Sequence, residues 1–408
     1  MPFGFGNHHQ SEALPHTLPL TQNSPLNLPH GLFTEQLSGT AFTRPRALNL
    51  HSWLYRQHPS AIHSDYQPAD FNIVEPLHAI QPPNPMRWSA LAPLKQAKDW
   101  LEGLLHIATN DHAHIYLYQC NQSMQRYFSS YDGELLFVPY LGKLSLHTEF
   151  GKLTIQPGQI AVIPRGVFFN IHVDALACGY ICENKGIPFM LPELGIVGAN
   201  ALANPRHFLY PDAAFETHSG AVTLICKYQD HCFKAQSPHS PLNVVAWQGN
   251  LAPYTYDLTL FNTINSVSFD HPDPSIYTVL TSPSHTPGIA NLDFVLFPPR
   301  WIVAEHTFRP PYFHRNIMSE LMGLISGKYE AKQAGFEPGG ISIHNSFIPH
   351  GPDSQTYKQA LTQSQQPQYL EDTLAFMFES CQIWKVTDVV MKQGARQLDY
   401  TQCWQNGL

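Results

Sequence analysis

The amino-acid sequence predicts a mainly β protein built from two copies of one small barrel, with a few helices. Proline and glycine are frequent, at 35 and 25 of 408 residues, and only 13% of residues are charged, which disfavours long surface helices. Hydrophobic residues make up 43% and aromatic residues 12%, so the chain can bury a packed core. Short β-rich runs that end at glycine or proline recur in two separate regions.

The first β-rich region spans residues 115–173. It contains the runs IYLYQC, ELLFVPYLG, KLSLHTEFG, KLTIQPG and QIAVIPRG. The second region begins near Val267 and contains the runs SVSFD, IYTVL, LDFVLFPP, DTLAFMFES and WKVTDVVM. Closely spaced strands with such turns predict antiparallel barrels or sandwiches. A break between the two regions at 255–262 predicts domains of residues 1–260 and 261–408.

Two segments outside these runs differ from them. Residues 1–85 are rich in proline, asparagine, serine and histidine, and we expect ordered segments and short strands that wrap a core. Residues 88–107 carry apolar side chains at helical spacing, which predicts one amphipathic helix. The apolar positions are Leu94, Ala97, Leu101, Leu104 and Leu105.

Composition excludes several classes of function. The net charge is −8 and no basic block occurs, so a nucleic-acid partner is not expected. The chain has neither a secretory signal nor an apolar stretch of about 18 residues, so no membrane partner is expected. The seven cysteines are odd in number and irregularly spaced, which favours a reducing cytoplasm over a disulfide framework.

The stretch 298–353 concentrates side chains that can bind a metal ion. Glu320, six residues and Gly327 match the first motif of the cupin family of jelly-roll barrels, H-x-H-x3-4-E-x6-G. His314 stands at the first histidine position and Asn316 at the second. The second half of the chain therefore resembles a metal-binding cupin barrel.

The first β-rich region carries a defective copy of the second cupin motif. Gly158, Pro164 and Gly166 match it, but Phe169 stands where the family has a metal-binding histidine. No histidine precedes Glu134 at the spacing of the first motif. We therefore predict duplicated cupin-like barrels, of which the N-terminal one is metal-free and filled by side chains.

Geometry restricts how His314 and Glu320 can share a metal ion. On one straight strand they would lie about 20 Å apart, and on one helix about 9 Å apart along the axis and on different faces. We therefore predict a turn at residues 315–319, although the periodicity of 317–325 also fits an amphipathic helix. The best third ligand is His350. Two histidines and one carboxylate leave open positions on an octahedral ion, as in non-haem Fe(II) oxygenases.

Each candidate also has an ordinary structural explanation. Most histidines in proteins are neither metal ligands nor bases. Glu320 is harder to explain in this way, because its neighbours are apolar and a buried carboxylate without partners costs on the order of several kcal/mol. The motif alone thus indicates a metal-binding cupin and leaves the metal open.

Longer stretches resemble the homogentisate dioxygenase family, in the family's order, from residue 4 to about residue 380. They include GFGNH, SEALP, LFTEQLSGTAFTRPR, NLHSWLYR, YDGELLFVP, EFGKLTIQPGQIAVIPRG, GANALANPR, FDHPDPSIYTVLT, PPRWIVAEHTFRPPYFHRN and PGGISIHNSFIPHGPD. The resemblance implies an enzyme that cleaves the ring of homogentisate with O2 to give maleylacetoacetate, in phenylalanine and tyrosine catabolism.

The resemblance also implies roles for individual residues. His314, Glu320 and His350 would ligate Fe(II), and His271 would be the acid–base residue. Tyr329, His344 and His350 would contact the substrate. From the residues alone, a turn histidine before Pro272 is the favoured explanation of His271, and Tyr329 is an ordinary strand aromatic. For His344, a structural role is nearly as well supported as a role near the substrate. His8 and His9 are expected to be structural.

The sequence departs from the family at a few positions. His16 stands where the family usually has glycine, and the pairs at 9–10 and 305–306 and Phe313 also differ. None of these departures falls on the expected ligands or on His271. They leave a turn and the shape of the pocket open.

The family also assembles as a hexamer of two stacked trimers, and we expect a homo-oligomer. Two alternatives remain open from the sequence: another cupin activity, such as a metal-dependent isomerase or a dioxygenase of a different aromatic acid, and a storage-like duplicated cupin with a structural metal. Substrate screening distinguishes the first alternative from the cleavage of homogentisate. The survival of a ligand set in only one barrel argues against the second.

Overall fold

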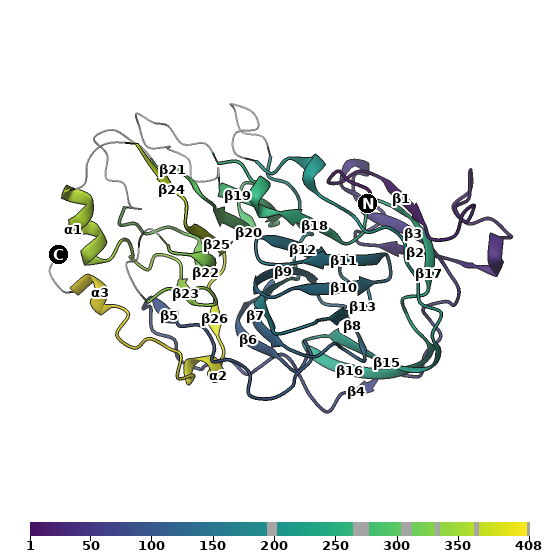
Figure 1. Cartoon of the computed structure of the whole chain (residues 1–408), viewed down its shortest axis with the longest axis horizontal. Helices are drawn as coiled ribbons and strands as arrows, with labels where there is room; N and C mark the ends of the chain where they lie inside the picture. The colour runs from purple at the N-terminus through teal and green to yellow at the C-terminus, as the bar shows by residue number, and fades with distance from the viewer. Residues whose placement is uncertain are drawn as a thin grey trace.

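The computed structural model describes residues 1–193, 202–263, 277–302, 312–329, 331, 335–362 and 367–405, and these residues form a mainly β protein (Figure 1). The predicted fold class is therefore confirmed. Within the described ranges, the α-helices lie in the C-terminal part: α1 (Ser354–Thr362), α2 (Asp388–Met391) and α3 (Gln402–Gln405). Short 3-10 helices occupy Pro29–Gly31, Arg46–Leu48, Pro205–His207 and Leu258–Leu260. None of the described helices has the length and apolar character needed to cross a membrane.

Two seven-stranded sheets form the N-terminal barrel at the centre of Figure 1. The first contains, in spatial order, β18 (Tyr254–Asp257), β12 (Gln159–Ile163), β9 (Glu134–Leu141), β14 (Ala177–Asn184), β7 (Ala113–Cys120), β6 (Leu104–Asn110) and β26 (Lys385–Val386). The second contains β11 (Gly151–Ile155), β10 (Leu144–Thr148), β13 (Phe169–His172), β8 (Tyr127–Ser130), β15 (Ser219–Tyr228), β16 (His231–His239) and β4 (Gln67–Pro68). The five β-rich runs predicted between 115 and 166 are all strands.

Aromatic side chains fill the space between these two sheets. Phe137 comes from the first sheet, and Phe128 and Phe169 come from the second. The ring of Trp100 lies 5.6 to 5.7 Å from all three rings. Phe169, at the position of the missing cupin histidine, is fully buried. Its apolar contacts agree with the predicted side-chain-filled interior, and the absence of a metal from this barrel stays a prediction.

A four-stranded sheet, with three strands from the N-terminal segment and one from residues 244–249, lies beside this barrel. Its order is β1 (His9–Glu12), β17 (Val244–Gly249), β3 (His51–Arg56) and β2 (Phe33–Ser38). The Trp247 indole N–H donates to the Phe150 carbonyl at 2.9 Å and joins this sheet to the barrel. The predicted short strands around a core are thus present. The ring of His9 is buried and its Nε2 lies 2.9 Å from the Gly4 carbonyl, in agreement with a structural role.

The turn after β1 explains the departure at His16. His16 has φ 64°, in the left-handed region that glycine adopts without strain. The Glu12 carboxylate accepts the backbone N–H groups of His16, Thr17 and Leu18 at 2.9 to 3.1 Å. These three bonds hold the turn although the residue is not glycine.

The C-terminal half is built on a six-stranded sheet. Its order is β19 (Thr278–Pro283), β20 (Ala290–Phe297), β25 (Thr373–Ser380), β22 (Ser319–Gly327), β23 (Ile341–His344) and β5 (Met86–Trp88). A two-stranded sheet joins β21 (Arg300–Ile302) to β24 (Gln368–Leu370). Strand β5 comes from the N-terminal half, and β26 near the C-terminus extends the first barrel. Each half therefore completes a sheet of the other.

The predicted helix over residues 88–107 is wrong. Trp88 ends β5, residues 100–103 form turns, and β6 begins at Leu104. Pro93 lacks the N–H that a helix interior needs, and Ala97 is exposed, so the apolar positions do not share one face. Gly103 packs against the Gln119 carbonyl and leaves no room for a side chain. The run WKVTDVVM is also mostly not β: Lys385 and Val386 form β26, Thr387 makes an isolated bridge to Leu77, and α2 follows.

Tyr180 of β14 connects the N-terminal barrel to the C-terminal sheet. Its hydroxyl is buried, donates to the Gly340 carbonyl at 2.9 Å and lies 3.1 Å from the Leu324 carbonyl. The Leu324 N–H donates back to it at 3.3 Å. Its ring packs edge-on against Phe376 of β25, with centroids 4.8 Å apart. Gly323 leaves space for both rings, since a Cβ there would collide with Phe376.

We predict that Tyr180→Phe lowers the free energy of unfolding by about 1–3 kcal/mol, because a buried carbonyl loses its donor while the ring contacts remain. Chemical denaturation followed by tryptophan fluorescence measures the change. Tyr369→Phe is the control, because Tyr369 is 44% exposed. Equal stabilities of Tyr180→Phe and the unmodified protein would show that these hydrogen bonds do not contribute to the free energy of unfolding.

Candidate metal centre

Three backbone segments place the candidate ligands side by side. Glu320 lies at the start of β22, and His314 precedes it across a bend at Ile317 and Met318. The predicted turn between the two residues is therefore confirmed, and the helical alternative for 317–325 is wrong. His350 follows β23 and pairs with His314 through two backbone hydrogen bonds of 2.9 and 3.2 Å.

The side chains of these three residues converge. His314 Nε2 lies 3.6 Å from Glu320 Oε1, and His350 Nε2 lies 2.9 Å from Glu320 Oε2. One ligand atom from each residue lies within 4.8 Å of the other two. Within the described ranges, this is the one group of three or more histidine, cysteine or acidic side chains close enough to share an ion.

Backbone carbonyls orient both imidazole rings. His314 Nδ1 lies 2.9 Å from the Tyr312 carbonyl, and His350 Nδ1 lies 3.0 Å from the Ile348 carbonyl. A carbonyl only accepts, so Nδ1 of each ring carries a proton and Nε2 points at Glu320. A protonated Nε2 donates to the carboxylate, whereas a neutral ring offers its Nε2 lone pair to a metal ion. Histidine ligands in metal sites are commonly held this way. The donor set therefore fits a divalent cation of the first transition row.

The charges of the site are strongly coupled. Burial alone would raise the pKa of Glu320, but the hydrogen bonds from His314 and His350 outweigh burial and hold this pKa well below its usual range. The hydrogen bond to Glu320 raises the pKa of His314 in spite of burial. Asn316, which replaces the second cupin histidine, donates its amide N–H to Glu320 Oε1 at 2.6 Å. Without a metal, these partners stabilise the carboxylate.

His344 lies directly beside the three candidate ligands. It is opposite Glu320 in the pairing of β22 with β23, and its Nδ1 lies 3.8 Å from Glu320 Oε2. Its ring stacks on that of His350 with centroids 4.0 Å apart and an interplanar angle of 8°. Its Nε2 lies 2.9 Å from the Tyr400 hydroxyl. The contact with a substrate stays a prediction.

Two other residues predicted for the substrate have different outcomes. Tyr329 follows the far end of β22, where its ring lies against Phe297 and Phe336 at 6.1 and 6.2 Å. This apolar cluster includes Met322 and Leu324, which share the face of Glu320 on β22. His271 lies outside the described residues, and so does the 305–306 pair.

The structure adds acidic residues that were not predicted. Glu379 of β25 pairs with Glu320, and Asp293 of β20 pairs with Glu379, so the three carboxyl groups form a row on one face. Burial, followed by the charges of Glu320 and Asp293, raises the pKa of Glu379 to about 7. Burial raises the pKa of Asp293 to about 6. An acidic residue within an apolar strand run, the signal that singled out Glu320, also marks both of these.

Phe313, the remaining departure near the site, packs against the chain after His350. Its ring lies against Gly351, where a side chain would collide with it, and 5.9 Å from the ring of Tyr357. Phe313 is 46% exposed. Phe313 therefore lies at the edge of the site, and these contacts do not involve Glu320.

Comparison with known families decides the affiliation of the chain. The family profile described as homogentisate 1,2-dioxygenase N-terminal matches residues 2–258, and the one described as homogentisate 1,2-dioxygenase C-terminal matches residues 259–407. The chain belongs to the homogentisate 1,2-dioxygenase family.

Proteins named homogentisate 1,2-dioxygenase from the Lens and Philadelphia 1 strains of Legionella pneumophila are similar to this member of the family. Each is 59% identical over 405 residues, which cover 98% of this chain and 97% of the relative. Among solved structures, protein Ylba from E. coli has a TM-score of 0.36 at 8% identity over 74% of this chain and 93% of its own. A cupin-2 domain protein from Shewanella frigidimarina has a TM-score of 0.20 at 20% identity over 22% and 84%. These structural likenesses are too weak to carry an argument.

We predict that the affinity of this homogentisate 1,2-dioxygenase family member for Fe(II) falls as the pH falls through the raised pKa of His314. A proton and the metal compete for the same Nε2 lone pair. The affinity for Fe(II) therefore reaches its maximum above that pKa and decreases by up to about 10-fold per pH unit below it. Anaerobic titration calorimetry from pH 5.5 to 8 measures the profile. His231→Ala is the control, because His231 is exposed and on β16. A flat profile would contradict binding at His314.

Proposed function

We propose that this protein is an Fe(II)-dependent ring-cleaving dioxygenase that converts homogentisate and O2 to maleylacetoacetate in phenylalanine and tyrosine catabolism. The observation that carries the proposal is the convergence of two carbonyl-oriented imidazoles on the buried Glu320 carboxylate, in a chain of the homogentisate 1,2-dioxygenase family. The mainly β fold and the apolar face next to Glu320 agree with it.

We assign His314, Glu320 and His350 as the ligands of Fe(II). Two neutral imidazoles and one carboxylate are the ligands that non-haem Fe(II) oxygenases use, because they leave adjacent positions open. The lowered pKa of Glu320 keeps its carboxylate charged and ready to bind a cation. When bound, iron would supply a Lewis-acid site for the substrate oxygens and O2 and a route for electron density from the ring to O2.

The side chains around the ligands bind and orient the substrate. Met322, Leu324 and Met377 form an apolar face on the strands next to Glu320, suited to an aromatic ring and to the exclusion of water. Tyr329 extends this face and is proposed to donate a hydrogen bond to the substrate. His344 and His350 are proposed to contact the substrate on the side of Glu320. His271 is proposed from the sequence as the residue that takes or shares the proton of a ring hydroxyl.

The remaining proposals concern organisation. We propose that residues 1–260 form a domain with a metal-free barrel and residues 261–408 the catalytic domain, each completed by one strand of the other. We further propose a cytoplasmic hexamer of two stacked trimers. The pronounced exposure of Leu20, Leu26 and Phe42 in the N-terminal segment supports contacts between subunits.

We predict equimolar consumption of O2 when homogentisate is added to the purified protein loaded with Fe(II) and ascorbate. An oxygen electrode measures uptake, and absorbance with mass spectrometry identifies maleylacetoacetate. His350→Ala should lose retained iron and at least about 100-fold in turnover, because a ligand is removed. His231→Ala should match the unmodified protein.

Two outcomes would contradict different parts of this proposal. No uptake by folded, iron-loaded protein would overturn the substrate, and the same assay with other ring-hydroxylated acids would then be informative. Full iron content and turnover in His350→Ala would overturn the ligand assignment.

A further inference from the structure

The ring of His344 is fixed from three sides. Its Nε2 lies 2.9 Å from the Tyr400 hydroxyl, its face stacks at 4.0 Å on His350, and its Nδ1 lies 3.8 Å from Glu320 Oε2. His344 and Tyr400 are 4% and 3% exposed, so water does not replace these contacts. The C-terminal tail therefore reaches the candidate metal centre through one buried hydroxyl.

The direction of the hydrogen bond from Tyr400 decides which tautomer His344 adopts. If Nε2 carried the proton and donated to Tyr400, the Nδ1 lone pair would face the negative Glu320 carboxylate. If the Tyr400 hydroxyl donates to Nε2, the proton is on Nδ1 and faces that carboxylate favourably. The charge of Glu320 therefore selects the second arrangement.

Arg87 strengthens Tyr400 as a donor. Its guanidinium carbon lies 4.2 Å from the centroid of the Tyr400 ring. The positive charge stabilises the negative charge that develops on the Tyr400 oxygen when its proton is shared, so the hydroxyl is a stronger hydrogen-bond donor. Arg87 belongs to β5, where it pairs with Ser342, two residues before His344 on β23. A strand of the N-terminal half thus places this cation beside the C-terminal site.

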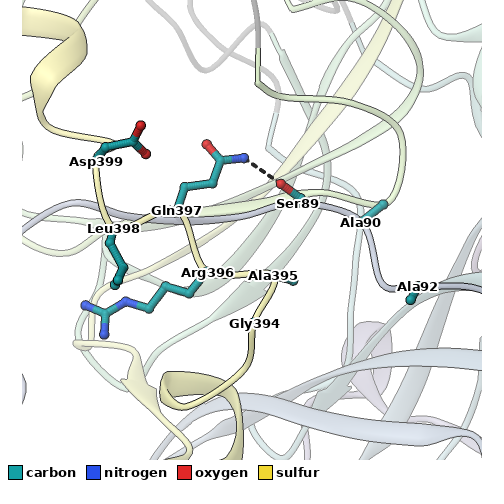
Figure 2. A pocket seen from close by; sticks show the side chains of 9 residues that line it. All are labelled: Ser89, Ala90, Ala92, Gly394, Ala395, Arg396, Gln397, Leu398 and Asp399. Atoms are coloured by element: carbon teal, nitrogen blue, oxygen red, sulfur yellow. Dashed lines mark hydrogen bonds between the residues drawn. The ribbon is translucent and has the colours of Figure 1, made fainter.

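Gln397 holds Arg87 from the outer side. Its Oε1 accepts the Arg87 Nε–H at 2.5 Å, and its Nε2 donates to Ser89 Oγ at 2.8 Å and to the Gly335 carbonyl at 2.7 Å. Figure 2 shows the bond to Ser89 in the wall of a surface hollow that is lined by Ser89, Ala90, Ala92 and residues 394–399. A chain of hydrogen bonds, one cation–π contact and one ionic contact therefore runs from this hollow to Glu320.

We propose that Tyr400 and Arg87 are positioning residues that hold His344 with its proton on Nδ1, facing Glu320. The stacked rings transmit the constraint, since a fixed His344 plane also fixes the plane of the His350 imidazole. The consequence for turnover rests on the proposed function. The consequence for metal binding rests only on the candidate ligands, so the two are measured separately.

The test is a double-mutant cycle on the full chain, with anaerobic Fe(II) affinity as one readout and the pH profile of kcat/KM as the other. Tyr400→Phe removes the hydroxyl and keeps the ring, and we expect about 10-fold weaker Fe(II) binding and a shifted pH profile, as for other groups that orient metal ligands. In a His344→Leu background, Tyr400→Phe should change affinity by less than about 2-fold, because the hydroxyl has no imidazole to orient.

Further variants separate positioning from folding. Arg87→Met should shift the pH profile in the same direction as Tyr400→Phe, and Arg87→Lys should restore part of the shift, because it retains the charge. Tyr55→Phe is the matched control: it removes a tyrosine hydroxyl that binds Asn23 and Gln248 in the N-terminal sheet and should leave both readouts unchanged. Thermal unfolding compares the stability of all variants.

Additive losses in the cycle, or unchanged iron affinity and pH profile in Tyr400→Phe, would overturn the proposal. If Tyr400→Phe does not fold, the Arg87→Met and Arg87→Lys variants test the proposal in its place. If the unmodified protein binds Fe(II) but does not oxidise homogentisate, the proposed function fails while the affinity cycle still tests the positioning of His344.

Discussion

The C-terminal half depends on one constraint: the carboxylate of Glu320 is buried inside a sheet, where a charge without partners costs on the order of several kcal/mol. His314, His350 and Asn316 offset this cost with contacts of 3.6, 2.9 and 2.6 Å. The same arrangement points two imidazole Nε2 atoms and one carboxylate at a common point, where they can share protons or bind a metal ion. The stability of the buried carboxylate and the affinity for a cation therefore follow from the same geometry, because a metal ion would take the place of the shared protons.

The backbone fixes this geometry before the side chains do. Pairing of β22 with β23 places His344 opposite Glu320, and the two bonds between His314 and His350 set the distance between the ligand-bearing segments. The carbonyls that orient the rings belong to these same segments. Strand β5 at the edge of the sheet and Tyr180 behind it come from the N-terminal half. The sheet that carries the candidate ligands is thus supported by residues distant in sequence, so both halves of the chain contribute to the surroundings of the site.

Much of the fold and the candidate ligands could be predicted from sequence because local patterns carry them. Alternating apolar runs predicted most strands, and the spacing of Glu320 and Gly327 identified the motif. The helix predicted at residues 88–107 was wrong because apolar residues at helical spacing also occur where turns bury side chains, here Trp100 and Leu101. Tyr400 and Arg87 gave no local signal: only strand pairing and the path of the tail bring them to His344. Glu379 and Asp293 were detectable in the sequence as charged residues within apolar strands. That they form a row with Glu320 follows only from the pairing register of the strands.

The convergence of His314, Glu320 and His350 on one metal ion is the central claim, and anomalous X-ray diffraction at the iron absorption edge tests it most directly. Crystals of the protein loaded anaerobically with Fe(II) should show a strong anomalous peak bounded by the two Nε2 atoms and the Glu320 carboxylate. A peak elsewhere in the chain, or an ordered triad with no anomalous density in iron-loaded crystals, would contradict the account.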